Sequence, residues 1–264
     1  MGFLEKVKNM FTEEVEEDDV KVEQIKKEVT HVKIDSPKEE VENDLTSINL
    51  ENLSIKPDTV NEKLLLHACC GPCALEPYRI LKEAGWDITI MYSNDNIYPE
   101  NEYKKRFDVL KNYCEENDIK LVKDNYNPES WNDNMSKFGS PKLKTEQRKN
   151  RCGACYLHRL ENAAKYAKEN SIKYISSTLA VSPYQFNDLL KEKLEICAKK
   201  YKLNAVFMDF RPYYKNATKR SIEIKMYRQK YCGCQLSFNE SKEQFKKTKN
   251  KKYLAQLEAI EQSQ

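Results

Sequence analysis

Short apolar runs alternate with longer helical patterns along the chain from residue 63 onward. Leu64-Leu65-Leu66 is one such run, and it leads directly into a turn, as a buried strand does. The helical pattern that follows ends at Gly85, a residue typical of helix C-termini. The pattern predicts strands at 64–66, 87–92, 120–123, 174–178 and 205–209, and helices at 73–84, 98–117, 152–169, 183–201 and 217–227.

Strand and helix therefore alternate five times. This order predicts an α/β fold: a single doubly wound domain of Rossmann, nucleotide-hydrolase-like type, with a five-stranded parallel sheet. Ligands of such sheets bind beyond the carboxyl ends of the strands, at the point where the strand order reverses. Cys69, Cys70 and Asp209 directly follow predicted strands, and Tyr184 follows another closely. We expect these residues to meet at one edge of the sheet.

Residues 1–62 have a different composition. They contain no glycine after Gly2, no aromatic residue after Phe11 and no cysteine, and charged residues dominate them. Such a segment buries too little apolar area to offset its ordering entropy. We predict a mostly disordered extension at 1–62, a catalytic domain at 63–238 and a Lys/Glu-rich helical tail at 239–264.

Charge divides the chain at the same place. Residues 1–62 hold 8 basic and 17 acidic residues, a formal charge of −9, and the remainder holds 37 and 25, or +12. A basic domain can bind a polyanion such as nucleic acid, although a lysine-rich solvated surface has the same composition. No stretch is long and apolar enough to span a bilayer, and no signal peptide is evident. We therefore expect a cytoplasmic protein without a membrane partner.

The nine cysteines are the most informative residues. Cys114 and Cys197 fall within helical patterns, where a free cysteine acts as a small apolar side chain. The other seven form three motifs: Cys69-Cys70-x-x-Cys73, Cys152-x-x-Cys155 and Cys232-x-Cys234.

Two motifs supply soft ligands at helix starts. A vicinal disulfide is strained, so adjacent cysteines at a strand end indicate thiolates instead. Cys69 and Cys70 together with Cys152 and Cys155 suit tetrahedral zinc or an iron–sulfur cluster. The spare thiols favour the cluster. Cys232 and Cys234 could form an easily reduced disulfide or ligate a second metal with Cys73, and the sequence leaves both open.

Six motifs together resemble the cobalamin-independent epoxyqueuosine reductases of the QueH type, over about residues 63–237. The resemblance rests on segments 64–73, 92–99, 151–160, 176–184, 209–211 and 227–234. Asp95 and Tyr98 depart from the usual Pro and His of the second segment, which puts substrate contacts in doubt.

The resemblance implies reduction of epoxyqueuosine to queuosine in the anticodon region of tRNA, with electrons from an unidentified donor. It implies a [4Fe–4S] cluster on Cys69, Cys70, Cys152 and Cys155. It also implies a redox-active pair, Cys232 and Cys234, which could instead hold a single iron beside the cluster.

Further candidates lie at the predicted edge. Asp209, Tyr98 and Tyr184 are candidate proton donors or orienting groups, although Asp209 could pair with Arg211 and the tyrosines could simply pack. Candidate phosphate or substrate contacts include Arg148, Arg151 and Arg211. Other basic residues that could line a phosphate track are Lys142, Lys144, Lys149, Lys215, Lys219 and Arg220.

Two other functions fit parts of the sequence. A non-catalytic zinc module binding RNA or protein would use the same cysteines. An ATP-dependent tRNA thiolation enzyme would share the sheet, but it needs a glycine-rich phosphate loop where this chain has Ala68-Cys69-Cys70-Gly71-Pro72.

Overall fold

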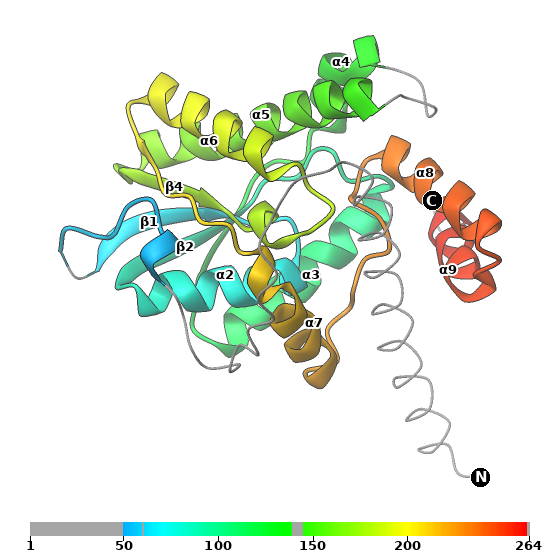
Figure 1. Cartoon of the computed structure of the whole chain (residues 1–264), viewed down its shortest axis with the longest axis horizontal. Helices are drawn as coiled ribbons and strands as arrows, with labels where there is room; N and C mark the ends of the chain where they lie inside the picture. Colours follow the sequence, from blue (N-terminus) through cyan, green and yellow to red (C-terminus); the bar gives the residue numbers. More distant parts are fainter. Residues whose placement is uncertain (1–49, 60, 139–144, 263–264) are drawn as a thin grey trace, which may run out of the picture. The chain divides into compact units, whose positions relative to one another are not determined.

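Five parallel strands form one sheet in the order β3-β2-β1-β4-β5 (Figure 1). The structure is a computed structural model that describes residues 50–59, 61–138 and 145–262. The strands are β1 (Glu62–His67), β2 (Trp86–Tyr92), β3 (Lys120–Lys123), β4 (Tyr174–Ser177) and β5 (Asn204–Ala205). The order reverses between β1 and β4, which places a ligand crevice beside the end of β1. The predicted five-stranded parallel sheet is confirmed.

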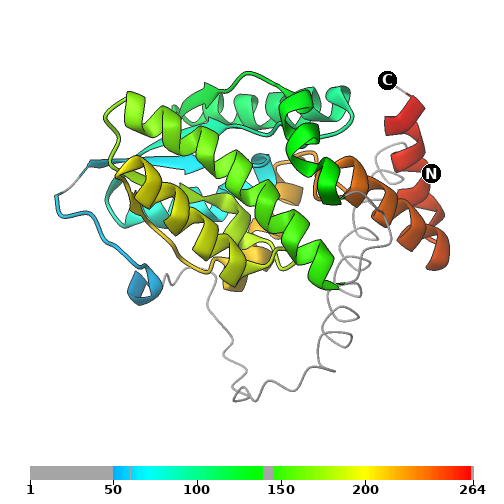
Figure 2. The same cartoon turned by 90° about the horizontal axis from the view of Figure 1, so that it is seen from above.

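Helices cover both faces of the sheet (Figures 1 and 2). On one face lie α5 (Thr145–Glu169) and α6 (Asn187–Tyr201), which pack on each other and on β4. On the other face lie α2 (Gly71–Glu83), α3 (Glu100–Glu116) and α7 (Tyr214–Glu223). The arrangement leaves the end of β1, where the first cysteines lie, between the two helical layers.

The central strand is fully enclosed. Leu64, Leu65 and Leu66 have no exposed surface, because β1 pairs with β2 on one side and β4 on the other under both helical layers. Burial of each leucine contributes about 1.5–3 kcal/mol. The core therefore holds rigid the strand from which the cysteine motif starts.

Several elements differ from the sequence prediction, and α5, for example, begins at Thr145 and not at the predicted 152. The helix α4 (Pro128–Met135) lies where a loop was expected, and Asn127 caps it by accepting a hydrogen bond from the main-chain N–H of Ser130. The strand β5 is shorter than the predicted 205–209, because the N–H of Phe207 donates to the hydroxyl of Ser54 and its carbonyl accepts from the N–H of Ser54.

Residues 50–58, which the sequence places in the extension, thus contact the domain. Leu53 is buried, and Ser54 pairs with the chain beyond β5. These contacts cover an otherwise unpaired sheet edge. Residues 1–49 and 60 of the predicted extension lie outside the described residues, as do Lys142 and Lys144, whereas Glu62 already belongs to β1.

The C-terminal segment forms two helices that pack side by side, α8 (Gln235–Lys247) and α9 (Lys251–Gln262) (Figure 1). They have a core of their own, made by Tyr231, Phe238, Phe245, Tyr253 and Leu257. The helix α8 begins four residues before the predicted tail, with Cys234 as its N-cap. In the described part of the chain, no helix has the length and apolarity needed to cross a membrane.

Candidate metal–thiol site

Three sulfur atoms meet where β1 passes into α2. The Sγ atoms of Cys69, Cys70 and Cys73 lie within 4.8 Å of one another, and those of Cys69 and Cys70 are 3.6 Å apart. A proline in the first turn of α2 favours the helix start that brings Cys73 back toward the other two. A Cβ atom at Gly71 would lie 2.7 Å from the sulfur of Met226, so a larger residue there would require that flexible side chain to move.

These three thiols, the thiol triad, share their protons unequally. Hydrogen bonds from Cys70 and Cys73 hold the pKa of Cys69 well below its usual value. Burial raises the pKa of Cys70, and donation to Cys69 raises that of Cys73. Cys69 is therefore the sulfur best prepared to act as an anionic ligand.

His67 is buried at the end of β1, two residues before the triad begins. Its Nε2 contacts the carbonyl of Ser93 at 3.1 Å, and its Nδ1 contacts the hydroxyl of Ser177 at 3.0 Å. Since a carbonyl only accepts, Nε2 carries the proton and Nδ1 accepts from Ser177. Burial lowers the pKa of His67 to about 3, so the ring is neutral and orients the loop.

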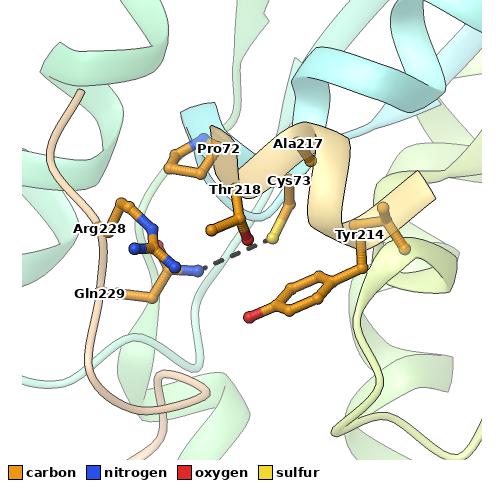
Figure 3. A pocket seen from close by; sticks show the side chains of 8 residues that line it. Pro72, Cys73, Tyr214, Ala217, Thr218, Arg228 and Gln229 are labelled. Carbon is orange, nitrogen blue, oxygen red and sulfur yellow. Dashed lines mark hydrogen bonds between the residues drawn. The ribbon is translucent and has the colours of Figure 1, made fainter. Parts of the chain in front are cut away.

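A small cavity adjoins the triad (Figure 3). Its volume is about 50 Å³, which holds a few water molecules. Gln229 faces Cys73 across it, and its Nε2 lies 3.7 Å from that sulfur and 3.0 Å from the sulfur of Cys70. The buried Oε1 of Gln229 has no hydrogen-bond partner. The cavity is also lined by Pro72, Val181, Tyr214, Ala217, Thr218 and Arg228.

The second thiol pair lies on α5. Cys155 is buried with Cys234, Trp131 and Met135, and its sulfur accepts a hydrogen bond from the indole N–H of Trp131 at 3.4 Å. Burial raises the pKa of Cys155 to about 11 and that of Cys152 to about 12. These thiols stay protonated at neutral pH unless a metal displaces the protons.

The third motif is a tight loop before α8. The sulfur of Cys232 accepts from the side-chain amide of Gln185 at 3.5 Å, and that of Cys234 accepts from the N–H of Ser237 at 3.4 Å. All nine cysteines are free thiols. Electrostatic interaction joins Cys152 and Cys155 to Cys232 and Cys234, so the second and third motifs form one group of thiols.

Arg159 interacts both with this group and with the triad, and the sequence predicted no role for it. It is buried, one helical turn beyond Cys155, and its charge interacts with the sulfurs of Cys155, Cys69 and Cys232. Arg159 is one of the residues of segment 151–160 that carry the family resemblance, but that segment does not show which groups the side chain meets. Its position becomes evident only once the three motifs are in place.

Several predicted substrate contacts have structural partners instead. Arg151 is buried in a two-point ion pair with Glu240 of α8, at 2.8 and 3.4 Å, so its guanidinium already has a partner and the phosphate contact stays a prediction. Asp209 accepts hydrogen bonds from Arg211 and from Asn187, which is the pairing that the sequence left open. Arg151 and Asp209 could therefore contact a substrate only if these bonds were broken.

Other predicted residues remain exposed. The Arg148 side chain is half exposed, 4.0 Å from Glu240, and Tyr184 is 40% exposed with its ring edge-on to Tyr214. Tyr98 is partly buried, and its main-chain N–H donates to the carbonyl of Gly233. Tyr98 thus ties the loop after β2 to the third cysteine motif.

The donor set fits a metal–sulfur group. The three thiols of the first motif lie within 4.8 Å of one another, and Cys155 and Cys234 share one buried cluster. Two buried polar atoms, Nε of Arg159 and Oε1 of Gln229, have no hydrogen-bond partner. Thiolates select zinc, copper(I) and iron–sulfur clusters over hard cations. The arrangement is therefore that of a metal centre with thiols to spare.

Comparisons with known proteins agree with this arrangement. The family model described as "Epoxyqueuosine reductase QueH" matches residues 64–240. A protein of that name from Histophilus somni (strain 129Pt) is 31% identical over 185 residues, 69% of this chain and 74% of the relative. Another, from Staphylococcus aureus (strain Mu50 / ATCC 700699), is 31% identical over 212 residues, 76% of this chain and 85% of the relative.

One solved structure is also similar. It is the U34-tRNA thiolase NcsA from Methanococcus maripaludis with its [4Fe-4S] cluster, which is 12% identical to this chain. The match has a TM-score of 0.42 and covers 77% of this chain and 73% of the other.

Proposed function

This chain belongs to the epoxyqueuosine reductase QueH family, and we propose that its thiol groups reduce epoxyqueuosine to queuosine in tRNA. The reaction removes the epoxide oxygen as water and leaves a carbon–carbon double bond. It consumes two electrons and two protons. The observation that carries the proposal is the cluster of Cys69, Cys70 and Cys73 at the end of β1, in a chain of this family.

A [4Fe–4S] cluster on Cys69, Cys70, Cys152 and Cys155 is our proposed cofactor. When bound, such a cluster supplies electrons one at a time at a low potential. The triad geometry supports two of these ligands and adds Cys73 as a fifth thiol beside them. Trp131 and Gln229 donate hydrogen bonds to the sulfurs of Cys155 and Cys70, which lowers the negative charge at each sulfur.

Cys232 and Cys234 are the proposed catalytic pair. The reaction needs two electrons, whereas the cluster would supply one at a time. The pair would provide the further reducing capacity, either as a dithiol or by holding a single iron. Gln185 fixes the sulfur of Cys232, and Cys234 is fixed as the N-cap of α8. Asp209 can act as a proton donor only after release from Arg211.

The cavity beside Cys73 is large enough for the water molecule that the epoxide oxygen forms. Its volume admits water and excludes a nucleobase, so a nucleoside would approach its mouth and not enter it. Thr218 and Tyr214 line the cavity and have hydroxyl groups that can bind water (Figure 3). We assign this cavity to the product water and its protons.

The substrate is proposed to be the anticodon region of tRNA, with the modified nucleoside extruded toward the thiols. Arg148 and Lys149 are exposed at the start of α5, just before Cys152, and can contact phosphates. Tyr184 presents an exposed ring on which a base can stack. The tRNA substrate and nine free thiols support a cytoplasmic location, with an electron donor still to be identified.

Anaerobic turnover tests the proposal. The purified full chain is incubated with tRNA containing epoxyqueuosine and dithionite, and the nucleosides are analysed by mass spectrometry. We expect loss of one oxygen atom from the modified nucleoside, and iron with broad absorbance near ~400 nm in the protein. A colourless protein with about one zinc ion per chain and no turnover would instead indicate a zinc-binding RNA module.

A further inference from the structure

Arg159 is a buried cation without a carboxylate partner among the described residues. Its exposed fraction is 1%, and its one side-chain acceptor outside the thiols is Oδ1 of Asn94. Its Nε has no hydrogen-bond partner. The other two buried arginines each pair with a carboxylate, Arg106 with Glu102 and Arg151 with Glu240. Burial of an unpaired guanidinium is costly, so Arg159 requires an anion from another source.

The groups around Arg159 that can carry negative charge are sulfur atoms. Arg159 lies four residues beyond Cys155 on α5, hence on the same face of the helix. Asn94 joins it to the triad, because the side-chain amide of Asn94 donates to the carbonyl of Ala68, the residue before Cys69. Burial would lower the pKa of Arg159, yet Cys155, Cys69 and Cys232 together raise it.

We propose that Arg159 is the counter-ion of the metal–sulfur group and raises its reduction potential. This inference rests on the proposed function, since it requires that the thiols hold the metal. Reduction adds one electron, and therefore one negative charge, to the group. A fixed cation in a dry site stabilises the reduced form more than the oxidised form. The free Nε–H can donate to a sulfur of the group, which acts in the same direction.

Two substitutions in the metal-loaded full chain separate charge from shape. Arg159→Gln removes the charge and keeps one hydrogen-bond donor, whereas Arg159→Lys keeps the charge. The midpoint potential is measured by redox titration with electron paramagnetic resonance. We expect Arg159→Gln to lower the equilibrium constant for reduction at least tenfold, which is a fall of about 59 mV in the midpoint potential of a one-electron couple. The midpoint potential of Arg159→Lys should stay closer to that of the wild type. Lys165→Gln, an exposed site farther along the same helix, is the matched control.

Stability gives a second readout. Without metal, Cys69 is the main sulfur that can face Arg159 as an anion, so Arg159→Gln should lower the melting temperature of the metal-free chain only slightly. With metal, it should reduce the stabilisation that loading confers. A Gln variant that binds no iron while the Lys variant does would also support the proposal.

Three results would overturn it. A Gln variant with the wild-type midpoint potential would show that the charge does not act on the group. Failure of the metal-free Gln variant to fold, where the wild type folds, would make Arg159 a structural residue. Equal loss of iron in folded Gln and Lys variants would assign it a role in shape. Absence of iron from the wild-type protein would refute the proposed function itself. Metal analysis of the wild type therefore distinguishes that outcome from failure of the Arg159 proposal.

Discussion

The guanidinium of Arg106 donates a hydrogen bond to the main-chain carbonyl of Cys232 over 3.0 Å. It also donates to the carbonyl of Tyr231 and is held from behind by Glu102, at 2.7 Å on the same helix. Both charged side chains are almost completely buried. The third cysteine motif is thus fixed by a side chain of α3, more than a hundred residues earlier in the chain.

Replacement of Arg106 by Gln should therefore both destabilise the domain and displace Cys232. It leaves the buried Glu102 without its cation, with the hydroxyl of Tyr227 still donating to it, and the free energy of unfolding should fall by about 3–5 kcal/mol. Turnover should fall more than tenfold in the fraction that remains folded. Denaturant unfolding and single-turnover assays measure the two effects. Lys104→Gln is the control, because its exposed pair with Glu100 on the same helix should contribute less than about 1 kcal/mol.

Cys73 should prove necessary for full metal content. Its sulfur lies within 4.8 Å of those of Cys69 and Cys70, so Cys73→Ala removes one thiol from the triad. We expect less iron per chain and weaker visible absorbance, measured after anaerobic purification. Cys114→Ala removes an equally buried thiol in α3 and should leave the iron content unchanged. Equal iron in both variants would exclude Cys73 from the metal site.

Arg148 and Arg151 should respond oppositely to substitution, although only two residues separate them. Arg148 is half exposed, and Arg148→Gln should reduce the salt dependence of tRNA binding by about one phosphate contact, with little change in stability. Arg151 is buried against Glu240, so Arg151→Gln should lower stability and leave the salt dependence unchanged. Filter binding at several salt concentrations and thermal unfolding distinguish these outcomes. A reduced salt slope in Arg151→Gln would contradict the assignment.

Gly233 should tolerate no side chain. Its φ of +148° is unfavourable for other residues, and a Cβ atom would lie 2.8 Å from Nδ2 of Asn96. Gly233→Ala should therefore shift the loop between Cys232 and Cys234 and lower both turnover and melting temperature. Gly153→Ala provides a contrast inside a helix, where the nearest atom belongs to the flexible side chain of Leu189 at 3.1 Å. If the two variants are equally stable and active, the loop conformation has no role.

Much of the fold follows from local patterns. A continuous apolar run marks β1, apolar residues alternating with Asp87 and Thr89 mark β2, and the alternation of strands with helices is sufficient to predict a parallel sheet. The helix α4 carried a signal that was missed: Asn127-Pro128-Glu129 combines an N-cap, a proline in the first turn and an early acidic residue. The short β5 was unpredictable, because its outer partner is Ser54, about 150 residues earlier.

The site was predictable only in part. Cysteine spacing identified the three motifs, since soft ligands in clusters are rare outside metal sites. The partners of the arginines depend on tertiary contacts that spacing does not encode. Arg151 and Arg159 lie on one helix, yet the first meets a carboxylate from α8 and the second meets sulfur. No local pattern distinguishes the two.

The dispersal of the thiols along the chain also sets an order of events during synthesis. The triad is complete early, but Cys152 and Cys155 emerge after β3, and Cys234 only after the last strand. Because Cys234 also caps α8, the final helices begin at an atom of the site itself. On the proposed assignment, the four cluster ligands are all present once α5 has been synthesised, whereas Cys232 and Cys234 join them only when most of the chain has left the ribosome.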